Sequence, residues 1–235
     1  KIVTYTGNGG TQSITGVGFK PDFVWIKGRT SADNNFIFDT TRGDSVTVNT
    51  NLTAAEYADT GVTSFDTGGF TLGSGAGENR DGDDYVAWCF KANGGTTSSN
   101  TDGNVTTTVQ VNSDAGFSIA KSASTAFMTS QTFGLGLGEE PDVVIVKSTD
   151  IVTEWRVYSK HLNNWDGFLK LNSTDALYTS SITTTVTSTT FSSNWTNTSG
   201  IWMLYSFKSI DSFSSFGTYT GNGVSGGGPI IETGF

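Results

Sequence analysis

The sequence has very few of the side chains that most enzymes use for nucleophilic or metal chemistry. It contains 235 residues but only one cysteine, Cys89, and one histidine, His161. A single cysteine excludes a disulfide framework within the chain and a zinc site built from several cysteines. A Ser-His-Asp triad would have to use His161, which lies in a polar stretch without a Gly-x-Ser-x-Gly nucleophile pattern. We therefore expect no enzymatic activity, no cofactor and no histidine-based metal site.

The sequence is also poor in positive charge and in long apolar runs. It has 13 lysines and arginines against 22 aspartates and glutamates, a net charge of −9. Nucleic acids and anionic membranes attract basic surfaces, so we expect neither as a partner. The longest apolar run, Val143–Val146, is far shorter than the roughly 18 residues of a membrane span. The chain begins at Lys1 rather than at methionine, and we expect a processed product or the ordered part of a longer protein.

Helical periodicity is nearly absent, with one short helical turn expected over Asn51–Tyr57. Elsewhere, runs of β-branched and aromatic residues alternate with clusters of Gly, Asn, Asp and Ser, which is typical of strands joined by turns. Many short strands at this spacing predict an all-β protein with antiparallel sheets of the jelly-roll or β-sandwich type. The expected strands are Ile2–Thr6, Phe23–Lys27, Asn35–Phe38, Phe70–Leu72, Asp84–Lys91, Val105–Val111, Gly116–Ala120, Asp142–Lys147, Trp155–Tyr158, Gly167–Leu171, Ile182–Thr187, Thr189–Phe191, Ile201–Lys208 and Phe216–Tyr219.

The sequence repeats itself. The segment Gly18–Lys27 resembles Gly138–Lys147, since both place Pro-Asp before an apolar run that ends in lysine. The motif Tyr-Thr-Gly-Asn-Gly at Tyr5–Gly9 returns at Tyr219–Gly223. Such self-similarity indicates tandem structural units of common ancestry. The third partial copy either closes the second sheet or belongs to a longer array, and we favour the first because a lone strand would leave an unpaired edge.

The repeat predicts two tandem β-sandwich lobes. The first lobe covers residues 1–95, and the second covers residues 116–235 with a terminal strand that repeats the start of the unit. Residues 96–115 are expected to be a linker or edge strand. The Gly-, Ser- and Thr-rich stretch Ala92–Asp102 has the composition of a flexible connector.

Three motifs together resemble a known family. They are Tyr-Thr-Gly-Asn-Gly at Tyr5, Gly-Phe-Lys-Pro-Asp-Phe-Val-Trp-Ile-Lys at Gly18, and Tyr-Val-Ala-Trp-Cys-Phe-Lys at Tyr85. This pattern is similar to a repeated β-rich domain in structural proteins of tailed, marine-type bacteriophages, and it covers nearly the whole chain. The second copy lacks the Asn-Gly turn at its start and the Trp-Cys pair at its end.

The resemblance implies a non-enzymatic protein at the virion surface, hence extracellular, in a tail fibre or a capsid decoration. It implies other virion subunits as partners and a homo-oligomer, by analogy a trimer. It carries no catalytic residue over to this chain. The expected function is assembly together with adhesion to host-surface polysaccharide.

Two tryptophans are the candidate ligand contacts. Trp165 and Trp195 both lie in polar, Asn-containing loops, where an exposed ring could stack on a sugar. The alternative is that both rings fill the ends of the sandwich, because large aromatic side chains dominate cores. Two other functional classes stay open. One is a bacterial secreted carbohydrate-binding module or adhesin, and the other is a glycan hydrolase or lyase, which would need paired carboxylates.

The densest acidic cluster is Glu78–Asp84. Its oxygen ligands could wrap a Ca²⁺ ion, although the full calcium-loop pattern is missing. An Asp-Gly turn leading into the next strand explains the same residues without a metal, and we favour that interpretation.

Overall fold

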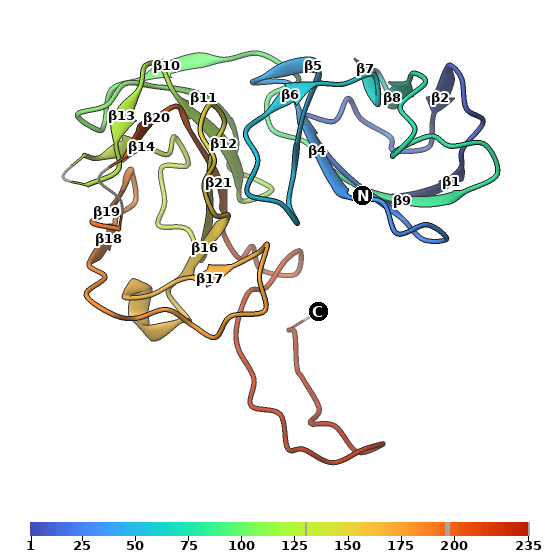
Figure 1. Cartoon of the computed structure of the whole chain (residues 1–235). Coiled ribbons are helices and arrows are strands. Elements are labelled where there is room, and N and C mark those ends of the chain that lie inside the picture. The colour runs from blue at the N-terminus through green and yellow to red at the C-terminus, as the bar shows by residue number, and fades with distance from the viewer. Residues whose placement is uncertain (130, 196–197, 235) are drawn as a thin grey trace.

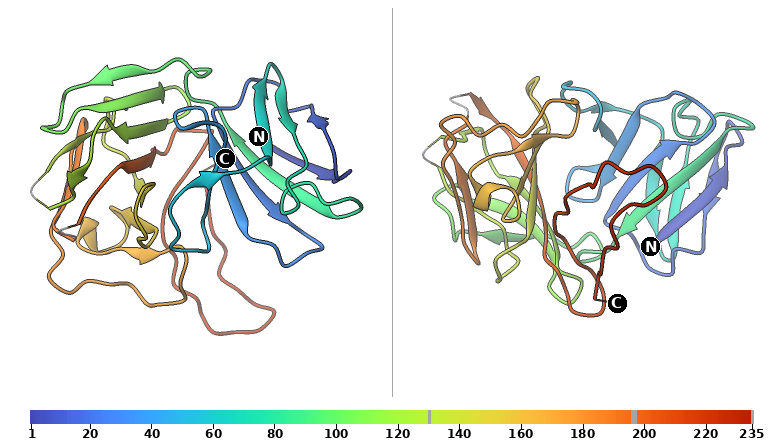
Figure 2. Two further views of the ribbon diagram at one scale, coloured as in Figure 1. Left: turned by 45° about the horizontal axis from the view of Figure 1, so that its top comes forward. Right: turned by 90° about the horizontal axis from the view of Figure 1, so that it is seen from below.

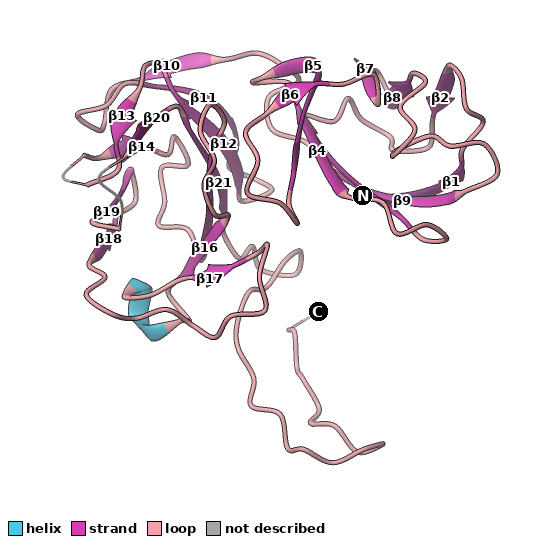
Figure 3. Ribbon diagram, viewed as in Figure 1, coloured by secondary structure: helices cyan, strands magenta, loops and turns pink. Residues whose placement is uncertain are grey.

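The computed structural model describes residues 1–129, 131–195 and 198–234. Its regular structure consists of antiparallel strands and one short 3₁₀ turn, η1 (Asn163–Trp165), so the predicted all-β class is confirmed (Figures 1 and 3). In the described part of the chain, no helix is long and apolar enough to cross a membrane.

The first lobe consists of a large sheet and a small one. The large sheet has the order β1 (Ile2–Thr6), β9 (Asp84–Phe90), β3 (Phe23–Gly28), β4 (Asn35–Asp39), β5 (Gly43–Asn49) and β6 (Tyr57–Ala58). The small sheet has the order β2 (Gln12–Ile14), β8 (Gly69–Leu72) and β7 (Val62–Asp66). Apolar side chains from both sheets, among them Val24, Phe38, Phe70 and Tyr85, form one buried cluster.

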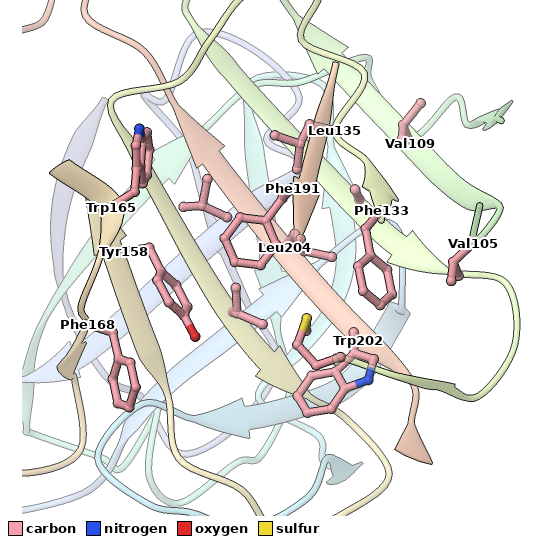
Figure 4. Packing of buried hydrophobic residues seen from close by; sticks show 14 of the residues in the cluster. Val105, Val109, Phe133, Leu135, Tyr158, Trp165, Phe168, Phe191, Trp202 and Leu204 are labelled. Carbon is pink, nitrogen blue, oxygen red and sulfur yellow. The ribbon is translucent and has the colours of Figure 1, made fainter. Parts of the chain in front are cut away.

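The second lobe has a similar construction. Its large sheet has the order β10 (Ser98–Asn100), β11 (Thr107–Asn112), β12 (Phe117–Ser122), β21 (Trp202–Phe207), β15 (Val143–Ser148), β16 (Arg156–Ser159) and β17 (Leu169–Lys170). Its small sheet has the order β14 (Phe133–Gly134), β19 (Thr190–Ser193) and β18 (Thr184–Val186), and a separate pair joins β13 (Ala126–Phe127) to β20 (Ser199–Gly200). A second buried cluster lies between these sheets (Figure 4).

The strand orders of the two lobes correspond. The run β1-β9-β3-β4-β5 in the first large sheet has its counterpart in β12-β21-β15-β16-β17, and β2-β8-β7 has its counterpart in β14-β19-β18. The Pro-Asp repeat motif leads into β3 and into β15, and these strands pair with β9 and β21, respectively. The common ancestry of the lobes stays a prediction.

A third apolar cluster lies between the two large sheets and joins the lobes. It contains Phe23, Ile37 and Val48 from the first lobe and Phe117, Ile119, Trp155, Met203 and Tyr205 from the second. Each large sheet therefore buries both faces, one inside its own lobe and one against the other lobe. The alternation along β9, where Tyr85, Ala87 and Cys89 face the first core, leaves Phe90 to face this seam. Cys89 is 1% exposed, as expected of a small buried apolar residue.

The predicted flexible connector over Ala92–Asp102 is wrong for its first half. The buried carboxylate of Asp22 accepts hydrogen bonds from the backbone N–H groups of Ala92, Gly94 and Gly95, at 2.7, 2.8 and 2.5 Å. The second half forms β10, and residues 96–115 supply the edge pair β10–β11 of the second large sheet. A carboxylate far away in sequence therefore fixes a segment whose composition is that of a flexible chain.

Two further expectations fail. Asn51–Tyr57 is not helical, because Thr53 and Glu56 pair with backbone groups of the second lobe: Thr153 N–H donates to Thr53 O at 3.0 Å, and Glu56 N–H donates to Thr149 O at 2.8 Å. The terminal strand over Phe216–Tyr219 is absent as well. Residues 208–234 contain no strand, and most of them extend away from both lobes (Figures 1 and 2).

Candidate functional site

The two candidate tryptophans have different surroundings. Trp165 is only 5% exposed and belongs to the second lobe's core, where it lies near Tyr158 (Figure 4). Its indole N–H donates to Glu140 Oε1 at 3.2 Å. Trp165 therefore fits the alternative expectation, in which the ring fills the core instead of stacking on a sugar.

Trp195 is half-buried. Its ring meets Phe168 and Tyr178 edge to face, with centroids 4.8 and 4.6 Å away. These contacts hold the indole against the core by one side. Trp195 also lines a surface cavity, so of the two tryptophans it is the candidate for ligand contact.

The cavity has a volume of about 420 Å³ and lies where the two lobes meet. The first lobe contributes Thr53 to its lining. The second lobe contributes residues 152–156, which lead into β16, and residues near Trp195. The hydrogen bond from Thr153 N–H to Thr53 O closes the junction beneath it. Its described lining consists of Thr53, Val152, Thr153, Glu154, Arg156, Trp195 and Thr198.

Arg156 supplies the positive charge of the cavity. Arg156 is 5% exposed. Its guanidinium carbon lies 5.0 Å from the ring centroid of Trp195 and 5.5 Å from the ring centroid of Phe168. Among the described residues, its Nε finds no hydrogen-bond acceptor. Burial lowers the pKa of Arg156, but the guanidinium keeps its proton at any ordinary pH. A buried donor without a partner is costly. Arg156 as a residue lines the cavity, and a guanidinium there can pair with an anionic oxygen.

Lys147 lies close behind Arg156. Its ammonium is buried and donates to Thr53 O at 3.0 Å, Thr153 O at 2.9 Å and Thr153 Oγ1 at 3.3 Å. Burial, with the neighbouring Arg156 charge, lowers the pKa of Lys147 to about 8. Lys147 thus joins Thr53 of the first lobe to Thr153 of the second beside the cavity, and its charge adds positive potential there.

Glu154 is the one carboxylate among the described lining residues. Its Oε2 accepts a 2.7 Å hydrogen bond from the Asn172 side chain, and its Oε1 lies 3.7 Å from Lys170 Nζ. Glycoside hydrolysis by the usual routes needs two carboxyl groups across the bond that is cleaved. The geometry of this cavity therefore suits binding better than glycan cleavage.

The acidic turn Glu78–Asp84 is occupied by internal contacts. Asp83 pairs with Arg80 at 3.1 Å, and Asp84 accepts a hydrogen bond from Thr6 at 2.8 Å. The side chains of Glu78 and Asn79 are buried in the first lobe. Across the described residues, no three His, Cys, Asp or Glu side chains gather as a metal site. His161 lies elsewhere, with its Nε2 3.5 Å from Asp142 Oδ1.

Sequence reasoning found Trp195 but missed Arg156, Lys147 and Thr53. The sequence offered one signal for such residues, which is a charged residue next to an apolar strand. Lys147 after Val143–Val146 is an example. That signal does not say where the strand end lies in space, and Thr53 belongs to the other lobe.

The family model described as Domain of unknown function (DUF7483) matches residues 1–235. No curated protein and no solved structure matches the chain.

Proposed function

The chain belongs to the family described as Domain of unknown function (DUF7483), and we propose that it is a non-enzymatic structural and adhesive protein at the surface of a tailed-phage particle. The proposal places it in a tail fibre or a capsid decoration. Three sequence motifs support it through their resemblance to phage structural proteins. A body joined by three apolar clusters suits a protein that presents loops on a rigid support.

The observation that carries the adhesive part is the contact of Trp195 with Arg156 in a surface cavity. A ring that lines a cavity can stack on the apolar face of a sugar, and a guanidinium that lines the same cavity can bind a carboxylate. The volume of 420 Å³ lies in the range of small-molecule sites. We therefore name acidic, carboxylate-bearing polysaccharide of the host surface as the ligand class.

Each such contact would be weak, because the cavity is open to solvent on the protein surface. Many copies on one particle would add their contacts, so avidity would provide firm attachment. The net charge of −9 does not oppose this, because Arg156 lines the cavity, Lys147 donates to Thr53 and Thr153 of its lining, and the lining carboxylate Glu154 lies 3.7 Å from Lys170.

Glycan binding is tested with acidic oligosaccharides of hexuronic acid and neutral glucose oligosaccharides, titrated into the chain by calorimetry. We expect the acidic series to bind and Trp195→Ala to abolish binding. Arg156→Gln should remove the preference for acidic over neutral sugars. Trp88→Ala, a half-buried tryptophan of the first lobe, is the matched control and should leave binding unchanged. Equal binding by Trp195→Ala and the native chain would overturn the proposed cavity.

The particle role is tested by labelling phage particles with an antibody against the chain and locating it by electron microscopy. Label on tails or capsids supports the proposal. A glycan-binding chain found only at a bacterial surface supports the alternative of a carbohydrate-binding module or adhesin. Depolymerisation of a host polysaccharide by the purified chain would show that the non-enzymatic assignment is wrong.

A further inference from the structure

The N-terminal motif Tyr5–Gly9 is held by specific contacts along its whole length. β1 pairs with β9, and the Tyr5 ring stacks on Tyr85 with centroids 5.2 Å apart. The Tyr5 hydroxyl donates to Glu78 O at 2.8 Å. We call the surface formed by β9 and residues 78–84 the β1 groove.

The turn after β1 fits the groove even more closely. Asn8 N–H donates to Asn79 Oδ1 at 3.0 Å, and the Asn79 amide donates back to Asn8 Oδ1 at 3.2 Å. The N–H groups of Gly7 and Gly9 donate to Asp83 O and Asn79 O, both at 2.8 Å. A Cβ at Gly7 would lie 2.2 Å from Arg80 O, so only glycine fits at this position.

The same five residues recur in the C-terminal arm, residues 217–234, as Tyr219–Gly223. The Asn-Gly turn within them has a similar form: φ is 69° at Gly223 and 70° at Gly9. Val224 N–H donates to Asn222 Oδ1 at 3.0 Å, as Gly10 N–H donates to Asn8 Oδ1 at 2.9 Å. The arm therefore already has the turn that fits the β1 groove.

The arm nevertheless has no surface against it at this motif. Tyr219 is 69% exposed, and no described atom lies within 4 Å of a Cβ placed at Gly221. Ile230, which follows the motif at a spacing close to that of Ile14 in the first copy, is 92% exposed, whereas Ile14 is 6% exposed. The arm carries the residues of a docked strand and turn in an undocked state.

We propose that this arm docks in the β1 groove of a second copy of the chain and joins copies head to tail. The arm is the expected occupant because its Tyr219–Gly223 has the same sequence and a similar Asn-Gly turn as Tyr5–Gly9, which fills the groove. The groove of the same chain is filled by its own β1. The base of the arm is fixed to the second lobe, because Ser209 N–H donates to Asp142 Oδ2 and Phe216 N–H donates to Ser209 Oγ at 3.0 Å. The association goes beyond the proposed function and does not depend on glycan binding.

The arm must compete with β1 of the accepting copy. Exchange of an equivalent element between copies has a low free-energy cost when the same contacts are remade. The arm can remake the contacts of the shared Tyr-Thr-Gly-Asn-Gly motif, but it has Gly217 where β1 has Val3, which packs on the first core. The tethered β1 acts at an effective concentration of about millimolar. Free chains should therefore exchange little in dilute solution and substantially when they are concentrated, as they would be on an assembly.

The experiment removes the competitor. Gly7→Ala places a Cβ 2.2 Å from Arg80 O, so β1 with its turn should no longer seat in the groove, while the groove residues and the arm keep their sequence. We expect Gly7→Ala to form concentration-dependent oligomers in analytical ultracentrifugation. The double variant Gly7→Ala/Gly221→Ala has the same clash in the arm and should stay monomeric. Gly221→Ala alone should behave as the native chain in dilute solution. Oligomers of equal size in the single Gly7→Ala and the double variant would overturn the proposal.

A folded, monomeric Gly7→Ala chain would also overturn it. If such a monomer lost stability on Gly221→Ala, the arm would fill the groove of its own chain, and docking between copies would still be contradicted. Circular dichroism establishes whether the variant is folded.

A second measurement does not depend on the folding of that variant. Thr4 pairs with Val86, and Thr218 precedes Tyr219 as Thr4 precedes Tyr5. In a Cys89→Ala background, Thr218→Cys with Val86→Cys should form disulfide-linked dimers and larger species at about millimolar concentration. Gly217→Cys with Val86→Cys, which places the two thiols on opposite faces, should not. Disulfides confined to monomers, or none in either pair, would contradict docking between copies.

Discussion

The hydroxyl of Tyr205 in the second lobe donates a 2.8 Å hydrogen bond to Asp39 Oδ2 in the first lobe. The same oxygen accepts from Arg42 Nε at 2.5 Å, and all three side chains are buried in the seam between the large sheets. The Trp155 indole N–H crosses the same seam to Asn49 O at 2.8 Å. Polar bonds thus help to set the register of a mainly apolar contact, because a shifted packing would leave the Tyr205 hydroxyl and the Trp155 indole N–H buried without their acceptors.

We predict that Tyr205→Phe lowers the free energy of unfolding by about 1.5–3 kcal/mol, the usual range for a hydrogen bond to a charged group. The ring still fills its place, so the loss measures the hydroxyl alone. Urea denaturation followed by fluorescence gives the value. Tyr219→Phe, at an exposed site, is the control and should change nothing. A variant as stable as the native chain would mean that Arg42 satisfies Asp39 by itself.

Asp22 gives a second prediction. Its carboxylate accepts three backbone N–H groups of the segment between the lobes, so Asp22→Ala should release residues 92–95. We expect faster cleavage near these residues in limited proteolysis, with the fragments identified by mass spectrometry. Asp44→Ala, an exposed aspartate on β5, should be cleaved like the native chain. Unchanged cleavage in Asp22→Ala would show that the seam holds the connector without the carboxylate.

Glu78 gives a prediction for pH. Its side chain is 1% exposed, its Oε1 has no hydrogen-bond partner among the described residues, and burial raises its pKa from 4.5 to about 8. Between these values the folded chain holds a proton that the unfolded chain has lost. The contribution of Glu78 to stability is therefore fully present below pH 4.5 and decreases as the pH rises to about 8.

Glu78→Gln mimics the protonated form and should remove this decrease. We expect the variant to gain stability relative to the native chain from about pH 5 to about pH 9, measured by urea denaturation at several pH values. Glu232→Gln, on the exposed arm, serves as the control. Parallel stability curves for Glu78→Gln and the native chain would show that Glu78 is ionised in the folded state.

Most of the central strands could be read from the sequence. β1 and the cores of β3, β9, β15 and β21 were expected, because apolar β-branched and aromatic runs between turn residues are a local signal. β2, β5 and β7 were not expected. β2 has only three residues, and β5 and β7 contain Asp, Ser and Thr, so the local apolar signal is weak and pairing with a neighbouring strand makes them strands.

The all-β class, most of the central strands, the acidic charge and the recurrence of the Tyr-Thr-Gly-Asn-Gly motif follow from composition and from neighbours along the chain. The burial of Trp165 and the position of Trp195 at a cavity follow from tertiary contacts, although both residues lie in similar Asn-Trp loops. The tertiary structure also decided that one copy of the repeated motif is docked and the other is not. The physical reason is the same in each case: burial and strand pairing depend on which distant surface is available, and the local sequence does not contain that information.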